Sequence, residues 1–299
     1  MRHNIQLIKN EIFHAQPVPP AYPTAGKARE LKSCHTQEVL DFLSVRPVHT
    51  VVMTSFINDN GLENPLNRGT FYGYKNAEGA LEGVALIGHT TLVEARSEDA
   101  LKALAHAARA SEVPLHLIMS DGVNAESFWK YLGNDAQPRL VCEELLFEIS
   151  FPFLVQKCDR EIRTARMEEL QEVAEAQAAI AFMECGVDPM TRDREGFLKR
   201  VARRIEQGRI FVVFENGEMI FKADIIAETS DVIYLEGIYV APSHRGQGIG
   251  SACLAGLSLE LLNRVQHISL LSNVSFTDAH RSYLKAGYKN TGSCVSLFV

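Results

Sequence analysis

A series of secondary-structure elements that occurs twice is the feature that most constrains the fold of this chain. Hydrophobic periodicity and turn residues predict the order strand–strand–helix–strand–helix–strand in residues 69–151, and the same order in residues 209–299. The segments "FWKYLG" and "SYLKAGY" occupy corresponding places in the two series. Strands that alternate with helices in this way favour an α/β fold, a central mixed β-sheet flanked by helices. We therefore expect two tandem α/β domains related by a degenerate repeat.

The length and the N-terminal composition give the expected domain limits. A chain of 299 residues favours two domains over one. The segment "AQPVPPAYP" near the N-terminus is rich in proline and is predicted to be extended. We predict an N-terminal extension at residues 1–35, a first domain at residues 36–157 and a second domain at residues 158–299.

Composition argues against several classes of function. The net charge is −7 and no dense block of Lys or Arg is present, so a nucleic-acid partner is not expected. No uninterrupted apolar run approaches the length of a membrane span, and the first residues lack the apolar centre of a signal peptide. The six cysteines lack CxxC or Cys/His ligand spacing. We expect a cytoplasmic protein with reduced thiols, no metal and no membrane partner.

Three glycines lie close together in the segment "APSHRGQGIGS", residues 241–251. The segment follows a predicted strand at residues 232–240 and precedes a predicted helix. A turn of this kind presents backbone N–H groups at a helix N-terminus, which favours phosphate binding. A dinucleotide fingerprint needs GxGxxG spacing and a Walker A loop needs Gly-Lys-Ser/Thr, and the segment has neither. A tight turn with close helix packing and no ligand is the alternative.

The wider pattern resembles the GNAT superfamily of acyl-CoA-dependent N-acetyltransferases. Residues 245–250 fit the loop pattern Arg/Gln-x-x-Gly-x-Gly/Ala, the preceding strand ends in "IYVAP", and "AHRSYLKAGY" follows. The resemblance covers residues 160–299 and implies acetyl-CoA as the acyl donor. The loop would bind the coenzyme A pyrophosphate, and the strand before it would pair with the pantetheine arm. The residues implied in coenzyme binding are Ile238, Tyr239, Val240, Arg245, Gly246, Gln247, Gly248, Ile249, Gly250 and Ser251.

The strand before the glycine segment carries a candidate general base. Alternation along this strand would place Tyr234, Glu236, Ile238 and Val240 on one face, where Glu236 is the only ionisable carboxylate. The resemblance implies that Tyr234 and Glu236 face the acceptor amine. A carboxyl group whose pKa is raised by an apolar setting suits removal of a proton from an ammonium nucleophile. A structural ion pair is the alternative role for Glu236.

A tyrosine near the C-terminus is the second catalytic candidate. Tyr283 matches the family pattern A-x-x-x-Y-x-x-x-G-F/Y, and the resemblance implies that its hydroxyl protonates the departing thiolate. A core aromatic residue is the alternative. Phe276 departs from the family because many relatives place a coenzyme-binding asparagine there, so Asn273 or Ser275 would replace it. Cys253 lies on the apolar face of the predicted helix and is expected to be a core residue rather than a nucleophile.

The first half lacks the glycine segment. The corresponding stretch reads "TLVEARSEDALKAL", in which Ser97 is a predicted helix cap and Asp99 lies in the first helical turn. Acidic residues at this point would repel a pyrophosphate. We therefore expect that the N-terminal half is a degenerate GNAT-like domain that binds no coenzyme there.

These features together predict an N-acyltransferase, in which the C-terminal domain transfers acetyl from acetyl-CoA to a primary amine. The expected partners are a small-molecule or peptide amine as acceptor and a second copy of the chain in a homodimer. Two alternatives stay open: a non-catalytic acyl-CoA-binding or regulatory protein, and a specialised transferase of a larger acyl group.

Overall fold

The computed structural model describes residues 26–133, 137–153 and 157–299, so residues 1–25 of the predicted N-terminal extension lie outside the described residues. The first half contains, in chain order, β1 (Arg29–Glu30), α1 (Thr36–Leu43), α2 (Pro47–Asn60), β2 (Gly69–Lys75), β3 (Leu81–Gly88), β4 (Thr90–Ala95), α3 (Glu98–Ala110), β5 (Leu117–Ser120), α4 (Gly122–Leu132) and β6 (Leu140–Ile149). Short 3-10 turns at Ser33–His35 and Pro65–Asn67 precede α1 and β2.

The second half repeats the order strand–strand–helix–strand–helix–strand after three helices. It contains β7 (Arg163–Thr164), α5 (Leu170–Cys185), α6 (Pro189–Arg192), α7 (Arg194–Glu206), β8 (Ile210–Glu215), β9 (Glu218–Glu228), β10 (Val232–Val240), α8 (Ile249–Leu261), β11 (His267–Asn273), α9 (Thr277–Ala286) and β12 (Lys289–Phe298). Short 3-10 turns at Met167–Glu169 and Pro242–His244 precede α5 and α8.

Several helix ends follow the local signals in the sequence. Ser97 is the N-cap of α3, and its Oγ accepts a hydrogen bond from the backbone N–H of Ala100. Gly133 and Gly287 end α4 and α9 in the left-handed conformation that glycine adopts without strain. These predictions from the sequence are confirmed.

The helix α2 was not predicted from the sequence. Its residues "PVHTVVMTSFINDN" show no apolar stripe of helical period, because the helix is buried on more than one side. Met53 and Ile57 pack in the core of the N-terminal half, whereas Val51 packs against Tyr234 of β10 in the C-terminal half. The helix therefore joins the two halves.

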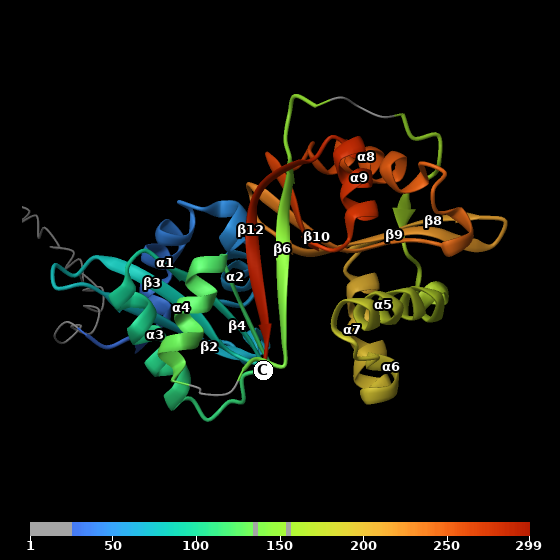
Figure 1. Ribbon diagram of the computed structural model, residues 1–299. Helices are drawn as coiled ribbons and strands as arrows, with labels where there is room; N and C mark the ends of the chain where they lie inside the picture. The colour runs from blue at the N-terminus through green and yellow to red at the C-terminus, as the bar shows by residue number, and fades with distance from the viewer. Residues whose placement is uncertain (1–25, 134–136, 154–156) are drawn as a thin grey trace, which may run out of the picture.

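All twelve strands of the described residues belong to one sheet, in the order β1-β2-β3-β4-β5-β12-β6-β11-β10-β9-β8-β7. The two halves exchange their last strands. β6 of the N-terminal half is antiparallel to β11, and β12 of the C-terminal half is antiparallel to β5. Figure 1 shows β6 and β12 side by side between the two lobes, and they are themselves paired along most of their length.

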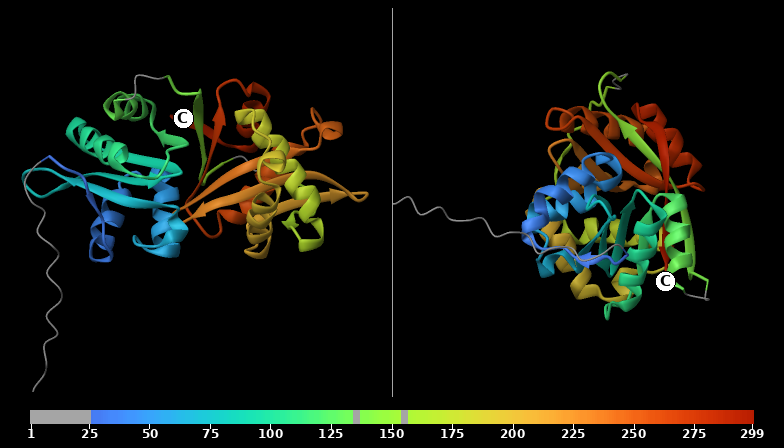
Figure 2. Two further views of the ribbon diagram at one scale, coloured as in Figure 1. Left: turned by 90° about the horizontal axis from the view of Figure 1, so that it is seen from below. Right: turned by 90° about the vertical axis from the view of Figure 1, so that its left-hand side faces the viewer.

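This architecture confirms two tandem α/β units with helices on both faces of a mixed sheet. The left view of Figure 2 shows the two lobes on either side of the exchanged strands. The predicted boundary at residue 157 falls between β6 and β7. The sequence repeat did not predict that the two halves exchange their last strands. Local periodicity predicts that a strand forms, but it does not predict which edge the strand joins.

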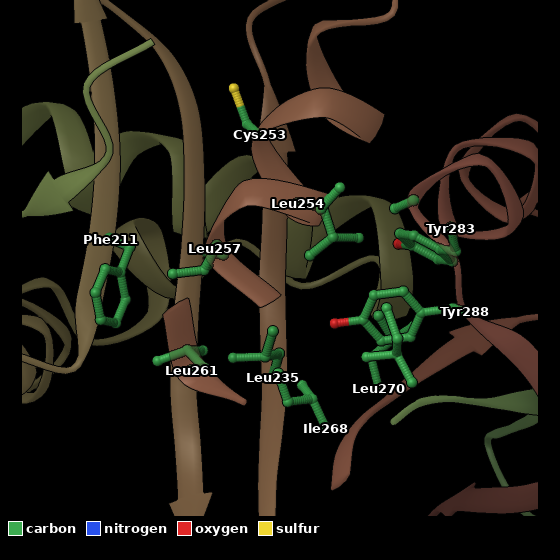
Figure 3. Close-up of a cluster of buried hydrophobic side chains, with 14 of the residues drawn as sticks. Phe211, Leu235, Cys253, Leu254, Leu257, Leu261, Ile268, Leu270, Tyr283 and Tyr288 are labelled. Carbon is green, nitrogen blue, oxygen red and sulfur yellow. The ribbon is translucent and has the colours of Figure 1, made fainter. Parts of the chain in front are cut away.

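Helices cover both faces of the C-terminal part of the sheet (Figure 1). On one face, here called the α8 face, a core forms between the strands and the helices α8 and α9, and Figure 3 shows its centre around Leu235, Leu257 and Tyr288. On the opposite face, here called the α5 face, the helices α5 and α7 pack on β8 and β9. Cys253 lies in the α8-face core, as expected, and burial raises the pKa of its thiol to about 12.

The strand β10 does not alternate along its whole length as expected. The register between β10 and β9 shifts between Glu236 and Tyr239, and Gly237 has φ +61°. This β-bulge reverses the alternation that follows it. Tyr234 and Glu236 therefore face the α5 side, whereas Ile238 and Val240 pack against the α8-face core. The expectation that all four side chains share one face is wrong.

Candidate functional site

The glycine segment forms a turn that leads directly into α8. Gly248 is the N-cap of the helix with φ +79°, and Gly246 has φ +76°. A side chain at either position would meet no atom within 4 Å, so the glycines are required by backbone conformation and not by crowding inside the protein. Gly250 differs, because a Cβ there would lie 2.9 Å from Val240 Cγ2. This glycine lets α8 start close against β10.

The backbone of this turn presents unpaired donors to the outside. Among the described residues, no acceptor is found for the N–H groups of Gly246, Gln247 and Gly248, and the first N–H groups of α8 have no intrahelical partner. Two side chains support the turn: Arg245 Nε donates to Val240 O at 3.0 Å, and Gln247 Nε2 donates to Ser243 O at 3.0 Å. Clustered N–H groups at a helix N-terminus can bind a pyrophosphate.

Beside this turn, β10 and β11 diverge. The two parallel strands are paired from Val232 to Leu235 on β10 and from His267 to Leu270 on β11. Beyond that point, the residues of β10 have strand partners only in β9. We call the gap between β10 and β11 beyond these pairs the open fork. On its β10 edge, the carbonyls of Gly237 and Val240 accept side-chain hydrogen bonds, and the other fork-facing backbone groups of residues 236–240 can pair with an extended ligand.

Glu236 lies at the start of the open fork on the α5 face. Its side chain is half-buried, and the Tyr234 hydroxyl donates a hydrogen bond to its Oε1 at 2.8 Å. Burial raises the pKa of the Glu236 carboxyl, while the hydrogen bond from Tyr234 and the charge of Arg204 partly oppose that shift. A raised pKa makes the carboxylate a stronger base. Tyr234 itself is buried and touches the fork only through its hydroxyl.

Two further carboxyl groups face Glu236. Glu184 lies at the end of α5, and Glu144 lies on the exchanged strand β6, opposite Asn273 of β11. Desolvation and repulsion from Glu236 and Glu144 raise the pKa of Glu184 to about 7, although its side chain still reaches solvent. Burial also raises the pKa of Glu144, whose Oε2 accepts a hydrogen bond from Ser296 Oγ at 2.5 Å. The α5 side of the open fork is therefore acidic.

Sequence reasoning did not identify Glu144 as part of this region. It belongs to the predicted first domain, and only the strand exchange brings it to the open fork. The sequence offered no signal for that placement. Glu184, in contrast, belongs to the C-terminal half, in the last turn of α5.

Tyr283 lies on the α8 face, opposite Glu236. Its ring packs edge-to-face on Phe147 of β6 at 5.4 Å between centroids, beside Tyr288 (Figure 3). Burial raises the pKa of Tyr283 to about 12, and the Glu184 charge contributes to that shift. The hydroxyl is therefore protonated at neutral pH and available as a proton donor.

Several of the remaining candidate side chains already contact other parts of the protein. Asn273 ends β11, and its Oδ1 accepts hydrogen bonds from the backbone N–H and the hydroxyl of Ser275. Only the amide Nδ2 is left to contact a ligand. Phe276 precedes α9 and makes no side-chain cap. Tyr239 packs against the α5-face core, and Ser251 Oγ donates to Gly248 O, so neither side chain points freely toward the loop.

Within residues 26–133, 137–153 and 157–299, no group of three or more His, Cys, Asp or Glu side chains has the arrangement of a metal site. In the same part of the chain, no helix is long and apolar enough to cross a membrane.

The geometry agrees with comparisons to known proteins. Residues 206–290 match the family model described as the acetyltransferase (GNAT) domain. A comparison with curated protein sequences gave no match. Among solved structures, a Drosophila protein is similar over 92% of this chain and 99% of its own, with a TM-score of 0.67 and 13% identity.

Two other solved structures are of GNAT proteins. A GNAT-family acetyltransferase from Colwellia psychrerythraea covers 91% of this chain and 99% of its own, with a TM-score of 0.55 and 14% identity. A tandem GNAT protein from the clavulanic acid biosynthesis pathway covers 91% and 98%, with a TM-score of 0.56 and 11% identity. At these identities the likeness concerns the fold, and it extends over both halves. The chain therefore carries a C-terminal domain of the GNAT acetyltransferase family.

Proposed function

We propose that this protein transfers an acetyl group from acetyl-CoA to a primary amine, and that the C-terminal half carries the reaction. The observation that carries the proposal is the position of Glu236. Its half-buried carboxyl, with a raised pKa, lies at the open fork next to a turn of unpaired N–H groups. The strand β10 thus carries a basic carboxylate and leads into a turn that can bind a phosphate. This combination suits acyl transfer from coenzyme A, a thioester that carries phosphates.

The residues of the fork fit coenzyme A. The N–H groups of Gly246, Gln247 and Gly248 would bind the pyrophosphate, and Arg245 adds a positive charge beside them. The free edge of residues 236–240 would pair with the pantetheine amides, and its N–H groups would orient the thioester carbonyl. When bound, acetyl-CoA supplies the acyl group.

The protein's own groups handle the protons. Glu236 takes the proton that the ammonium form of the acceptor must lose, and Tyr234 holds one carboxyl oxygen so that the other faces the substrate. Tyr283 gives its proton to the sulfur as the thiol leaves. Glu236 and Tyr283 lie on opposite faces of the sheet. Proton removal from the amine and proton delivery to the sulfur therefore take place on different sides of the fork.

The charge of the site favours a cationic acceptor. Glu144 and Glu184 surround Glu236 and have pKa values raised by desolvation and mutual repulsion. A protonated amine would relieve that repulsion.

The test is a thiol-release assay with acetyl-CoA against polyamines, aminoglycosides, amino acids and peptides. We expect release with at least one amine class, and Tyr283→Phe should slow turnover while it preserves coenzyme affinity. Coenzyme binding without thiol release for any amine would favour a non-catalytic acyl-CoA-binding protein. Release only with a longer acyl donor would favour the alternative of a larger acyl group.

A further inference from the structure

A lysine is buried directly beneath the bulge of β10. The Lys222 side chain is 0% exposed and its Nζ contacts three oxygen atoms. It donates to Gln177 Oε1 of α5 at 2.6 Å and to the Gly237 carbonyl at 3.2 Å, and it forms an ion pair with Asp224 Oδ1 at 2.6 Å. Two of these contacts are hydrogen bonds and the third is an ion pair, so the protein itself supplies the polar partners of the ammonium group. Burial of an ammonium group costs a large desolvation free energy, so a buried ammonium group is normally paired with an acidic group.

Lys222 contacts β10 at Gly237, where the β-bulge separates β10 from β11. At Gly237 the φ is +61° and the register of β10 shifts. A Cβ at this position would lie 2.6 Å from Gln177 Oε1 and 2.8 Å from Lys222 Nζ, so the glycine and the lysine fit closely against each other. Glu236 lies just before the bulge and faces the α5 side, and the bulge turns Ile238 and Val240 to the α8 face.

We propose that Lys222 is a positioning residue, whose ammonium group holds the Gly237 carbonyl and so fixes the bulge that keeps the fork open and directs Glu236 toward the acceptor. This inference rests on the proposed function of Glu236. Lys222 does not contact the glycine loop, and it reaches the fork edge only through the Gly237 carbonyl, so it acts through Gly237 and through its charge.

The charge of Lys222 has a measurable consequence at Glu236. The groups that face Glu236 are Tyr234 on β10, Arg204 on α7, Lys222 and Asp224 on β9, Glu184 on α5 and Glu144 on β6. Lys222 and Arg204 favour the ionised carboxylate, whereas Asp224 opposes it. Removal of Lys222 alone should therefore raise the Glu236 pKa, because one positive charge is lost and Asp224 remains.

The experiment uses the full chain in three forms: Lys222→Met, Lys222→Met with Asp224→Leu, and the control Lys199→Met, which removes an exposed lysine of α7. Carboxyl NMR measures the Glu236 pKa without coenzyme or acceptor, and calorimetry measures coenzyme A affinity. In Lys222→Met we expect the Glu236 pKa to rise by about one unit. Coenzyme affinity should fall about tenfold or more, because the fork edge loses its anchor.

The double variant separates the two effects. It removes both charges, so the Glu236 pKa should return toward the wild-type value, while coenzyme A should still bind weakly because Gly237 O has no donor. It also remains informative if the single variant fails to fold, since apolar residues replace a buried ion pair with little loss of stability. An unchanged Glu236 pKa in Lys222→Met, or wild-type coenzyme affinity in the double variant, overturns the inference. A wild-type protein that binds no coenzyme overturns the proposed function instead, and the NMR result still decides the role of Lys222.

Discussion

The two halves contain the same fork, but only one of them is open. In the N-terminal half, β4 and β5 are parallel and paired from Thr90 to Leu92, and they then diverge as β10 and β11 do. A carboxylate stands at the same place in both, because Glu94 and Glu236 each lie four residues after the first paired residue, Thr90 or Val232. The two halves thus share a glutamate at the same position as well as the same arrangement of strands.

In the N-terminal half, side chains close the gap. Ser120 Oγ on β5 donates to Val93 O at 2.8 Å, and Asn124 Nδ2 on α4 donates to Ala95 O at 3.4 Å. Glu94 is buried against Arg46, whose Nη1 lies 3.1 Å from Oε1 and also contacts Asp121 Oδ2 at 2.9 Å. The strand edge that would receive an extended ligand is therefore occupied by the protein itself.

The N-terminus of α3 is also less suited to bind a ligand than the N-terminus of α8. Where α8 begins at a glycine with outward N–H groups, α3 begins at Ser97, and the acids Glu98 and Asp99 occupy its first turn. The Ser97 hydroxyl already accepts one of the N–H groups that a phosphate would need. A few side chains are thus enough to close a fork that the same arrangement of strands and helices leaves open in the C-terminal half.

The largest expected difference between the halves is catalytic. Glu236→Gln should lower kcat by about 10²–10⁴, because the amide keeps the shape but loses the basicity of a general base. The raised Glu236 pKa predicts that wild-type activity increases with pH through that pKa, and this acidic limb should disappear in the variant. The matched variant Glu94→Gln should leave kcat and the pH profile unchanged. A kcat loss of similar size in both variants would contradict the comparison.

Coenzyme binding should distinguish the two helix starts. Gly248→Val places a β-branched residue at φ +79° and should weaken coenzyme A binding by about 100-fold, since such strain costs roughly 1–3 kcal/mol and the loop must also move. Ser97→Ala should leave that affinity unchanged and lower the free energy of unfolding by about 1 kcal/mol through loss of the cap. Calorimetry gives the affinity together with the stoichiometry. A value of two coenzymes per chain would show that the N-terminal half binds as well.

The smallest expected effect concerns the acceptor. Glu184→Gln removes one charge from the α5 side and should raise the acceptor KM about two- to fivefold, as expected for one partly exposed charge. Because the Glu184 pKa is about 7, the effect should be present above that pH and should decrease below it, where the wild-type carboxyl is protonated. The control Glu195→Gln changes an exposed acid of α7. An equal KM change in both variants would assign the effect to overall charge.

Local signals predicted the parts of the site that a short segment can form alone. The glycine segment, the cap at Ser97 and the position of Cys253 in the core depend on contacts within one helix or turn. The roles of Glu236 and Tyr283 stay predictions. The bulge at Gly237 was missed, because alternation assumes a regular strand and a glycine in a strand does not by itself specify a bulge.

By itself, the sequence determined the repeated order of strands and helices, the turn at residues 241–251 and the absence of that turn from the first half. Only the tertiary structure decided that β6 and β12 exchange places, that Glu144 joins Glu236, and that Lys222 holds the bulge from a neighbouring strand. The reason is the range of the forces involved. Backbone conformation and helix caps are set by neighbours in the chain, whereas strand partners and buried ion pairs depend on the burial of residues far apart in the sequence.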